Sequence, residues 1–248
     1  MFLPVLLDTL VVALIAATAL LLAKQNRRPR FALLFLVVYA VARTVNRLPS
    51  PEALGLHPEG LAYNWVGHLF MVAWVLIVVR IGPLWAKDIG LTLRQRSGTV
   101  LPAILVTLGV IVFKGGIALL TSGGPPDDLM TERLLFQITM PALAQELVYS
   151  GALLSLMLVA LGGKRVDQQF DWTLPVVLAV VVTALSHGIT FGLQYDPGLQ
   201  FGITAFLVPF MGKLVYGWLR LSTGSLLFPI LAFSLSNLAV LLLPYLLG

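Results

Sequence analysis

Eight long apolar runs, separated by short polar loops, form the main pattern of this chain. They cover roughly residues 2–23, 31–46, 61–82, 100–121, 134–161, 173–194, 199–219 and 225–247. Each run is unbroken rather than alternating, and a helix needs about 20 apolar residues to cross a bilayer. Backbone groups in lipid must pair within their own segment, so helix is the expected state. The pattern predicts an all-α, polytopic transmembrane helix bundle of about eight spans, the second of them short.

The composition agrees with this prediction. The chain has 248 residues, of which 58% are hydrophobic and 11% are charged, whereas soluble domains carry about 25% charged residues. No stretch outside the runs is long enough for a soluble domain. The first run lacks a basic leader region and a small-residue cleavage site, so we expect a retained anchor. The absence of cysteine excludes disulfides, thiolate metal sites and a cysteine nucleophile.

The basic residues alternate between loops and predict a topology. Eleven of the 16 Lys and Arg residues fall in the first, third, fifth and seventh loops or at their edges: Lys24, Arg27, Arg28, Arg30; Arg80, Lys87, Arg94, Arg96; Lys164, Arg165; and Arg220. By the positive-inside rule both termini then face away from the cytoplasm. The net charge of +5 therefore reflects topology, and we expect a bilayer environment and no nucleic-acid partner. The expected location is the plasma membrane, in a bacterium the inner membrane.

A turn-rich loop, TSGGPPDD at 121–128, is the natural boundary within the chain. It separates N-terminal membrane helices at 1–120 from a core bundle at 121–248 that carries the polar residues discussed next. We expect the two parts to form one structural unit.

Glu146 is the only formal charge between Leu134 and Gly163. A carboxylate near the middle of a span costs about 2.5 kcal/mol or more, and such residues usually mark functional sites. Glu146 and Ser150 are four residues apart and share a helix face, with Gln145 on a neighbouring face. A carboxylate removed from bulk water is a candidate general base for activating water. The alternative is a Glu that hydrogen-bonds a neighbouring helix and only holds the bundle together.

Two further polar groups are isolated in apolar runs. His187 lies in a charge-free stretch between Asp171 and Asp196, and Asn237 lies in the charge-free tail after Arg220. Either side chain could orient water or stabilise an oxyanion. The competing interpretations are a packed histidine bonded to a carbonyl and an asparagine that joins two helices. A metal site has little support, because one Glu and one His could be joined only by His57 or His68.

Taken together, these segments resemble the CPBP family of CAAX-protease and bacteriocin-processing membrane proteins, also called Abi or type II CAAX protease-like. The family's first motif, E-E-x-x-x-R followed by Gly, corresponds to QELVYSG at 145–151. The second, Phe-x-x-x-His, corresponds to TALSH at 183–187. The third, His-x-x-x-Asn, corresponds to FSLSN at 233–237. The resemblance implies a helical intramembrane peptidase in which Glu146, His187 and Asn237 carry the catalysis.

Two flanking segments extend the resemblance to roughly residues 85–245. DIGLTLR at 88–94 is similar to a cytoplasmic loop of the family, and YGWLRLSTGSL at 216–226 is similar to the turn before its last catalytic helix. The family's site is expected to open to the cytoplasm. Residue counting instead places His187 and Asn237 nearer the other ends of their spans, so the loop charges favour a site that faces outward.

The chain departs from the family motifs at four positions. Gln145, Ser150, Thr183 and Phe233 stand where the family has Glu, Arg, Phe and His. Gln145 cannot act as a base, so catalysis would depend on Glu146. Ser150 removes the usual ion-pair partner of that carboxylate. Phe233 removes an oxyanion donor or water ligand, a loss that costs about 10²–10³ in rate in oxyanion sites.

Three functions follow from these observations. The first is a glutamate-type intramembrane endopeptidase that cleaves a membrane-anchored protein or peptide and needs no cofactor. The resemblance implies prenylated C-termini, leader peptides or other membrane-anchored proteins as substrates, and for a bacterial chain we expect processing of peptides or sorting tails. The second is a catalytically impaired relative that acts as a membrane binding or immunity module. The third is a small transporter that moves protons or ions along a path of buried polar residues: Glu146, His187, Asp8, Lys114 and Lys213. The sequence shows no inverted repeat, which counts weakly against a transporter. Asp8 and Lys213 also lie near span ends, where their charged groups could snorkel to water.

Overall fold

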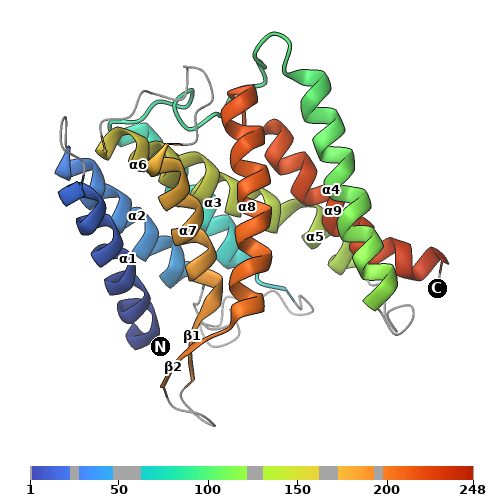
Figure 1. The fold of residues 1–248 in the computed structure, drawn as a ribbon, viewed down its shortest axis with the longest axis horizontal. Helices are drawn as coiled ribbons and strands as arrows, with labels where there is room; N and C mark the ends of the chain where they lie inside the picture. The colour runs from blue at the N-terminus through green and yellow to red at the C-terminus, as the bar shows by residue number, and fades with distance from the viewer. Residues whose placement is uncertain are drawn as a thin grey trace.

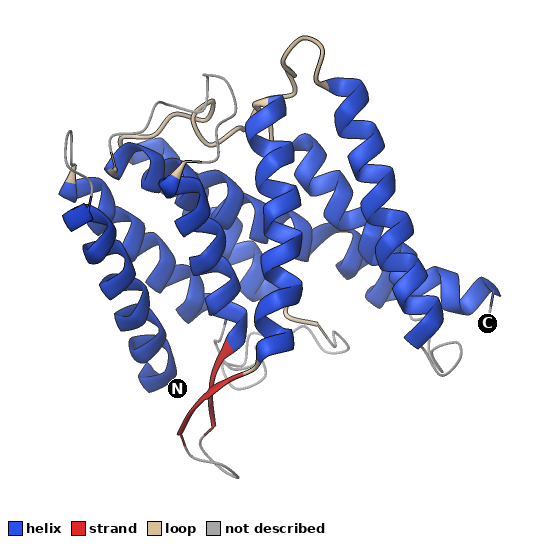
Figure 2. Cartoon of the chain, in the orientation of Figure 1, coloured by secondary structure: helices blue, strands red, loops and turns tan. Residues whose placement is uncertain are grey.

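The computed structural model of the chain describes residues 2–22, 28–46, 63–121, 131–161, 173–192 and 198–247. Within these ranges the fold is a helix bundle with one short hairpin (Figures 1 and 2). The helices are α1 Phe2–Leu22, α2 Pro29–Asn46, α3 Trp65–Ile81, α4 Val100–Thr121, α5 Thr131–Gln145, η2 Glu146–Leu153, α6 Leu154–Ala160, α7 Leu174–Gly188, α8 Ile203–Thr223 and α9 Leu227–Leu247. The predicted all-α bundle of eight helical runs is confirmed, because α5, η2 and α6 are consecutive parts of one run.

The run Thr131–Ala160 is the central helix of the bundle. It has 30 residues, and 89% of its most apolar window is buried inside the protein. Contacts from α2, α3, α7, α8 and α9 surround it. Glu146 is near the middle of this helix, and its side chain has no surface exposed to solvent.

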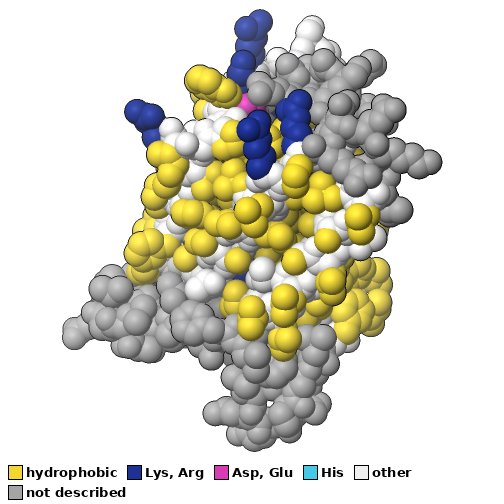
Figure 3. Space-filling view, turned by 90° about the vertical axis from the view of Figure 1, so that its left-hand side faces the viewer, with side chains coloured by type: hydrophobic (Ala, Val, Ile, Leu, Met, Phe, Trp, Pro, Cys, Tyr) yellow, Lys and Arg dark blue, Asp and Glu magenta, His cyan; other side chains and the backbone are white. Residues whose placement is uncertain are grey.

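Within the described residues, three helices are long and apolar enough to cross a membrane: Val100–Thr121, Thr131–Ala160 and Leu227–Leu247. Shorter apolar helices accompany them at Val5–Leu21, Trp65–Ile81 and Leu174–Gly188. The outer helices carry large exposed apolar side chains, among them Val112 at 71% and Phe113 at 68% exposure. A broad hydrophobic band covers one flank of the molecule (Figure 3). Such a surface fits lipid rather than water, so the chain is an integral membrane protein.

The described parts of the basic loops lie at one end of the bundle. The Arg28 amide donates to the Ala160 carbonyl at 2.9 Å, and the Arg96 amide donates to the Thr223 carbonyl at 3.0 Å. Exposed cations at this end are Arg28, Arg30, Arg80, Lys87 and Arg94. Figure 3 shows Lys and Arg side chains gathered above the hydrophobic band. This is the alternating distribution on which the topology prediction depends; which side of the membrane this end faces stays a prediction.

The loop between α3 and α4 is fastened to the turn between α8 and α9. Arg220 is completely buried and donates from Nη2 to the Asp88 carbonyl at 2.8 Å. The Leu226 amide donates to the Gly90 carbonyl at 2.9 Å. Gly90 has a φ of 82°, and a Cβ there would lie 2.4 Å from Arg220 Nε. The two segments that resemble the family's loop and turn therefore form one cap, which fixes the start of α9 and thereby the position of Asn237.

The end of α7 differs from the prediction. The apolar runs at 173–194 and 199–219 predict helix throughout, but the helix stops at Gly188 and a hairpin follows, with β1 Ile189–Gly192 antiparallel to β2 Gly198–Phe201. A Cβ at Gly188 would lie 2.7 Å from Phe206 Cβ. The close approach of α8 and the β-branched residues after Gly188 favour the extended state. The hairpin lies at the end opposite the α3–α4 loop (Figure 1).

A buried ion pair joins α1 and α2. Asp8 is 1% exposed, accepts from the Tyr39 hydroxyl at 2.5 Å and pairs with Arg43 Nε at 2.6 Å. Asp8 therefore does not snorkel, which the sequence left open, because its carboxylate is held inside the protein by two donors.

Candidate functional site

The Glu146 side chain is fully buried and tied to two donors. Its Oε2 accepts from Ser150 Oγ at 2.5 Å, and its Oε1 accepts from and pairs with Lys213 Nζ. Glu146 begins η2, a π-helical stretch in the middle of the central helix. Such stretches are rare and occur frequently at functional sites. The shared face predicted for Glu146 and Ser150 is therefore present, with their side chains hydrogen-bonded.

Lys213 is the partner of Glu146 that the motif comparison did not identify. It lies on α8, is 5% exposed and places Nζ 5.4 Å from the Tyr149 ring centroid, 5.6 Å from Tyr216 and 5.5 Å from Phe233. Three aromatic faces and one carboxylate therefore stabilise the ammonium. Lys213 is thus held inside the bundle and does not snorkel. With Ser150 in place of the family's Arg, Lys213 is the cation that pairs with Glu146. The available sequence signal was an isolated charge in an apolar run, which is also how Glu146 was recognised.

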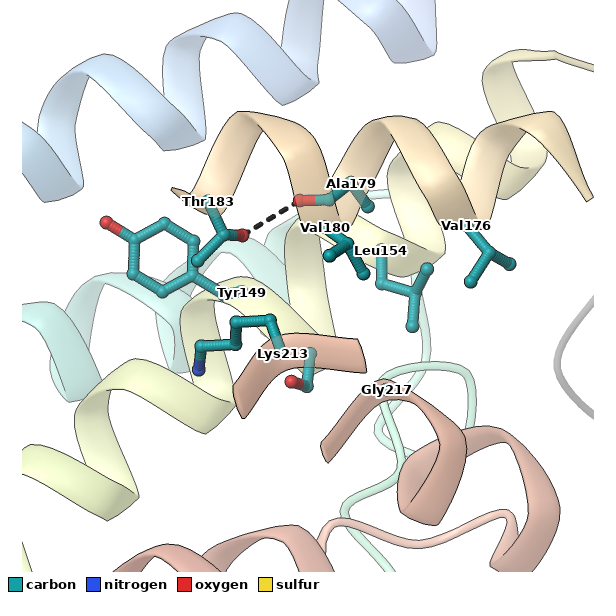
Figure 4. Close-up of a pocket in the computed structure, with 9 residues that line it drawn as sticks. Tyr149, Leu154, Val176, Ala179, Val180, Thr183, Lys213 and Gly217 are labelled. Carbon is teal, nitrogen blue, oxygen red and sulfur yellow. Dashed lines mark hydrogen bonds between the residues drawn. The ribbon is translucent and has the colours of Figure 1, made fainter. Parts of the chain in front are cut away.

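A small pocket with a volume of about 10 Å³, which is room for about one water molecule, lies beside this pair. It is enclosed by η2, α6, α7 and α8 and is lined by Tyr149, Ser150, Leu154, Val176, Ala179, Val180, Thr183, Lys213 and Gly217. Figure 4 shows Lys213 extending toward Tyr149, with the apolar side chains Leu154 and Val176 farther along the same pocket. Glu146 is not part of the lining. Of the three residues of the ion-pair centre, Lys213 and Ser150 therefore belong to the pocket lining and Glu146 does not.

His187 lies beside this centre without joining it by a hydrogen bond among the described residues. It is half-buried in the last turn of α7, and its ring centroid is 6.4 Å from that of Tyr149. The Tyr149 hydroxyl in turn lies 3.3 Å from Ser186 Oγ. Tyr149 thus stands next to both Lys213 and His187, and a change in its position would reach both.

Asn237 belongs to a second polar centre. Its Oδ1 accepts from Lys114 Nζ at 3.0 Å, and its Nδ2 donates to the side-chain and main-chain oxygens of Gln137 at 3.3 and 3.5 Å. The free Gln137 carbonyl has a local cause. Pro141 lies four residues later inside α5 and has no N–H to donate to it. Pro141 thus leaves the Gln137 carbonyl able to accept a hydrogen bond from Asn237 on α9.

Phe233 adjoins both polar centres. Lys114 Nζ lies 5.3 Å and Lys213 Nζ 5.5 Å from its ring centroid, and the ring stacks on Tyr216 at 5.4 Å. Glu146, His187 and Asn237 thus occupy one region of the bundle, but in the part of the chain described here their hydrogen bonds go to other residues and not to one another.

The remaining candidates are placed as follows. Gln145 is half-buried at the junction of α5 and η2. His68 is bonded through Nδ1 to the Asn64 carbonyl at 2.8 Å, and His57 lies outside the described residues. Within the described ranges no three His, Cys, Asp or Glu side chains come close enough to hold a metal ion.

Comparisons with known proteins bear on the same half of the chain. A family model described as type II CAAX prenyl endopeptidase Rce1-like matches residues 129–239. Searches of the curated proteins and of the solved structures found no match. The matched range begins before the central helix and ends after Asn237, so it contains all three motifs. The resemblance to the CAAX-protease-like family is thereby confirmed.

Proposed function

We propose that the chain is an intramembrane endopeptidase of the type II CAAX prenyl endopeptidase Rce1-like family, whose model matches residues 129–239, and that its general base is Glu146. The observation that carries the proposal is a completely buried carboxylate in a π-helical stretch of the central helix, bonded to Ser150 and Lys213, which are both part of the lining of a small pocket. In this reaction Glu146 takes a proton from water as the water oxygen bonds to the carbonyl carbon of the substrate. The proton then passes to the leaving nitrogen as the C–N bond breaks.

The other two predicted site residues have supporting roles in this proposal. His187, next to Tyr149, orients the water or the departing amine. Asn237 is held by Lys114 and Gln137, which fixes the direction of its amide and the position of α9 against the central helix. The substrate is a membrane-anchored protein or peptide, since the pocket opens within a bundle whose outer surface faces lipid.

The test uses membranes of a bacterial host that expresses the chain together with single-span reporter proteins carrying candidate leader or tail segments. We expect cleavage with the native chain and with Glu132→Gln, which alters a half-buried carboxylate at the start of the same central helix. Glu146→Gln should abolish cleavage. Reporter cleavage that is equal in the native chain and in Glu146→Gln would refute the assignment of the base.

A second function, a catalytically impaired binding or immunity module, has one observation in its favour. Asn237 is bonded on both sides to helix partners, as in an interhelical contact. On this account Glu146→Gln would leave the biological effect of the chain intact while Asn237→Ala would reduce it. The Glu146→Gln variant therefore distinguishes a peptidase from a binding or immunity module.

A further inference from the structure

Among the residues that line the pocket beside Glu146, Lys213 alone carries a formal charge. Lys213 lines the pocket, whereas the Glu146 carboxylate that it contacts does not. An ammonium group has three N–H donors. Among the described residues Lys213 hydrogen-bonds only to Glu146, and the rest of its surroundings are the faces of Tyr149, Tyr216 and Phe233. Aromatic faces attract a cation but leave its other N–H groups able to donate to a strong acceptor.

Position 233 explains why such a donor matters. The third motif has a histidine where this chain has Phe233, and a phenyl ring cannot donate to an oxyanion. Lys213 Nζ lies 5.5 Å from the centre of that ring, and the ring is held in place by stacking on Tyr216. A cation on α8 therefore stands beside the position on α9 from which a donor is missing.

We propose that Lys213 is a catalytic residue that donates a hydrogen bond to the carbonyl oxygen of the scissile peptide and stabilises the oxyanion formed from it. The inference rests on the proposed function. As the water oxygen bonds to the carbonyl carbon, the electron pair of the C=O bond moves to oxygen, and the proton lost by water goes to Glu146. Lys213 keeps its protons throughout. Its charge acts most strongly here because the site is removed from water.

The geometry also accounts for the pairing with Glu146. Before reaction the ammonium balances the buried carboxylate. When Glu146 becomes protonated in the attack, that pairing weakens, and the negative charge moves to the substrate oxygen. The cation is then attracted to the new charge, so its interaction is stronger in the transition state than in the ground state, which is what accelerates a reaction.

The test is kinetic and uses the full-length protein in lipid nanodiscs with a quenched-fluorescence peptide derived from a cleaved reporter. Lys213→Met should lower kcat about 10²–10³-fold with KM changed less than about threefold, and Lys213→Arg should retain most of the rate. Lys87→Met, which removes an exposed lysine in the loop after α3, is the matched control and should equal the native chain. A phosphinate analogue of the same peptide, which mimics the tetrahedral intermediate, should bind Lys213→Met more weakly by the same factor as kcat/KM falls.

Restoring the missing donor gives a second, independent measurement. Phe233→His should raise the rate of Lys213→Met by at least tenfold but change the native rate much less, because the two donors would serve one oxygen and their effects would not add. Thermal unfolding of each variant separates loss of folding from loss of chemistry.

The outcomes distinguish the two proposals. If Glu146→Gln is inactive while Lys213→Met keeps its rate, or loses affinity for substrate and analogue equally, Lys213 is not an oxyanion donor and the proposed function stands. If Glu146→Gln cleaves as fast as the native chain, the proposed function fails, and the role of Lys213 fails with it.

Discussion

The Glu146–Lys213 ion pair makes a prediction about stability that does not depend on any substrate. The carboxylate is completely buried and the lysine is 5% exposed. Replacing Lys213 by Met removes the cation and leaves Glu146 with Ser150 as its remaining donor. Removing one partner of a buried pair typically costs about 3–5 kcal/mol, because the other charge stays buried without compensation. At about 2–4 °C per kcal/mol for a protein of this size, Tm should fall by roughly 6–20 °C.

The double variant Glu146→Gln with Lys213→Met is the decisive comparison. With both charges gone, no uncompensated charge remains, and an apolar replacement of a buried pair is often neutral or stabilising. We expect the double variant to unfold within about 1 kcal/mol of the native chain, so the two single effects should be strongly non-additive. The assay is thermal unfolding in lipid nanodiscs, followed by intrinsic tryptophan fluorescence. Single effects that simply add in the double variant would refute the conclusion that the two side chains form a pair inside the bundle.

Two further predictions concern the scaffold. Gly90→Ala should lower the free energy of unfolding by about 1–3 kcal/mol more than Gly98→Ala. Both glycines have positive φ, but only at Gly90 would the new Cβ meet the Arg220 guanidinium. Equal unfolding temperatures of the two variants would contradict the close fit of Gly90 against Arg220. Arg43→Met should cost about 3–5 kcal/mol, because it leaves the Asp8 carboxylate buried without its cation, whereas Arg80→Met, which removes an exposed arginine at the end of α3, should cost less than about 0.5 kcal/mol. Thermal unfolding measures both comparisons, and an Arg43→Met variant as stable as Arg80→Met would rule out the inferred ion pair.

The pattern of apolar runs was sufficient to predict the helices but not their ends. Each expected run contains a helix, because composition and length in a bilayer leave no other state for it. Near Gly188 the prediction failed. The runs on either side are equally apolar. Besides the β-branched residues after Gly188, the end of α7 is favoured by the close approach of Phe206 from α8, a tertiary contact that is not visible in the local sequence.

The candidate site divides in a similar way. Glu146 stood out because a charge within an apolar run has few explanations, and its bond to Ser150 follows from helical spacing. Lys213 carries the same signal, but its pairing with Glu146 depends on how α8 packs against the central helix. The bond from Asn237 to the Gln137 carbonyl depends on a proline in a third position, Pro141. Motif comparison alone therefore found the missing Arg and His but not the lysine that lies beside both positions.

The central claim is that Glu146 activates water for peptide-bond hydrolysis. The most direct measurement is cleavage of a reporter in ¹⁸O-labelled water by the purified native chain and by Glu146→Gln, followed by mass spectrometry of the new termini. The account predicts one ¹⁸O atom in the new carboxyl terminus with the native chain and no new terminus with Glu146→Gln. The same labelled terminus formed at the same rate by both proteins would contradict it.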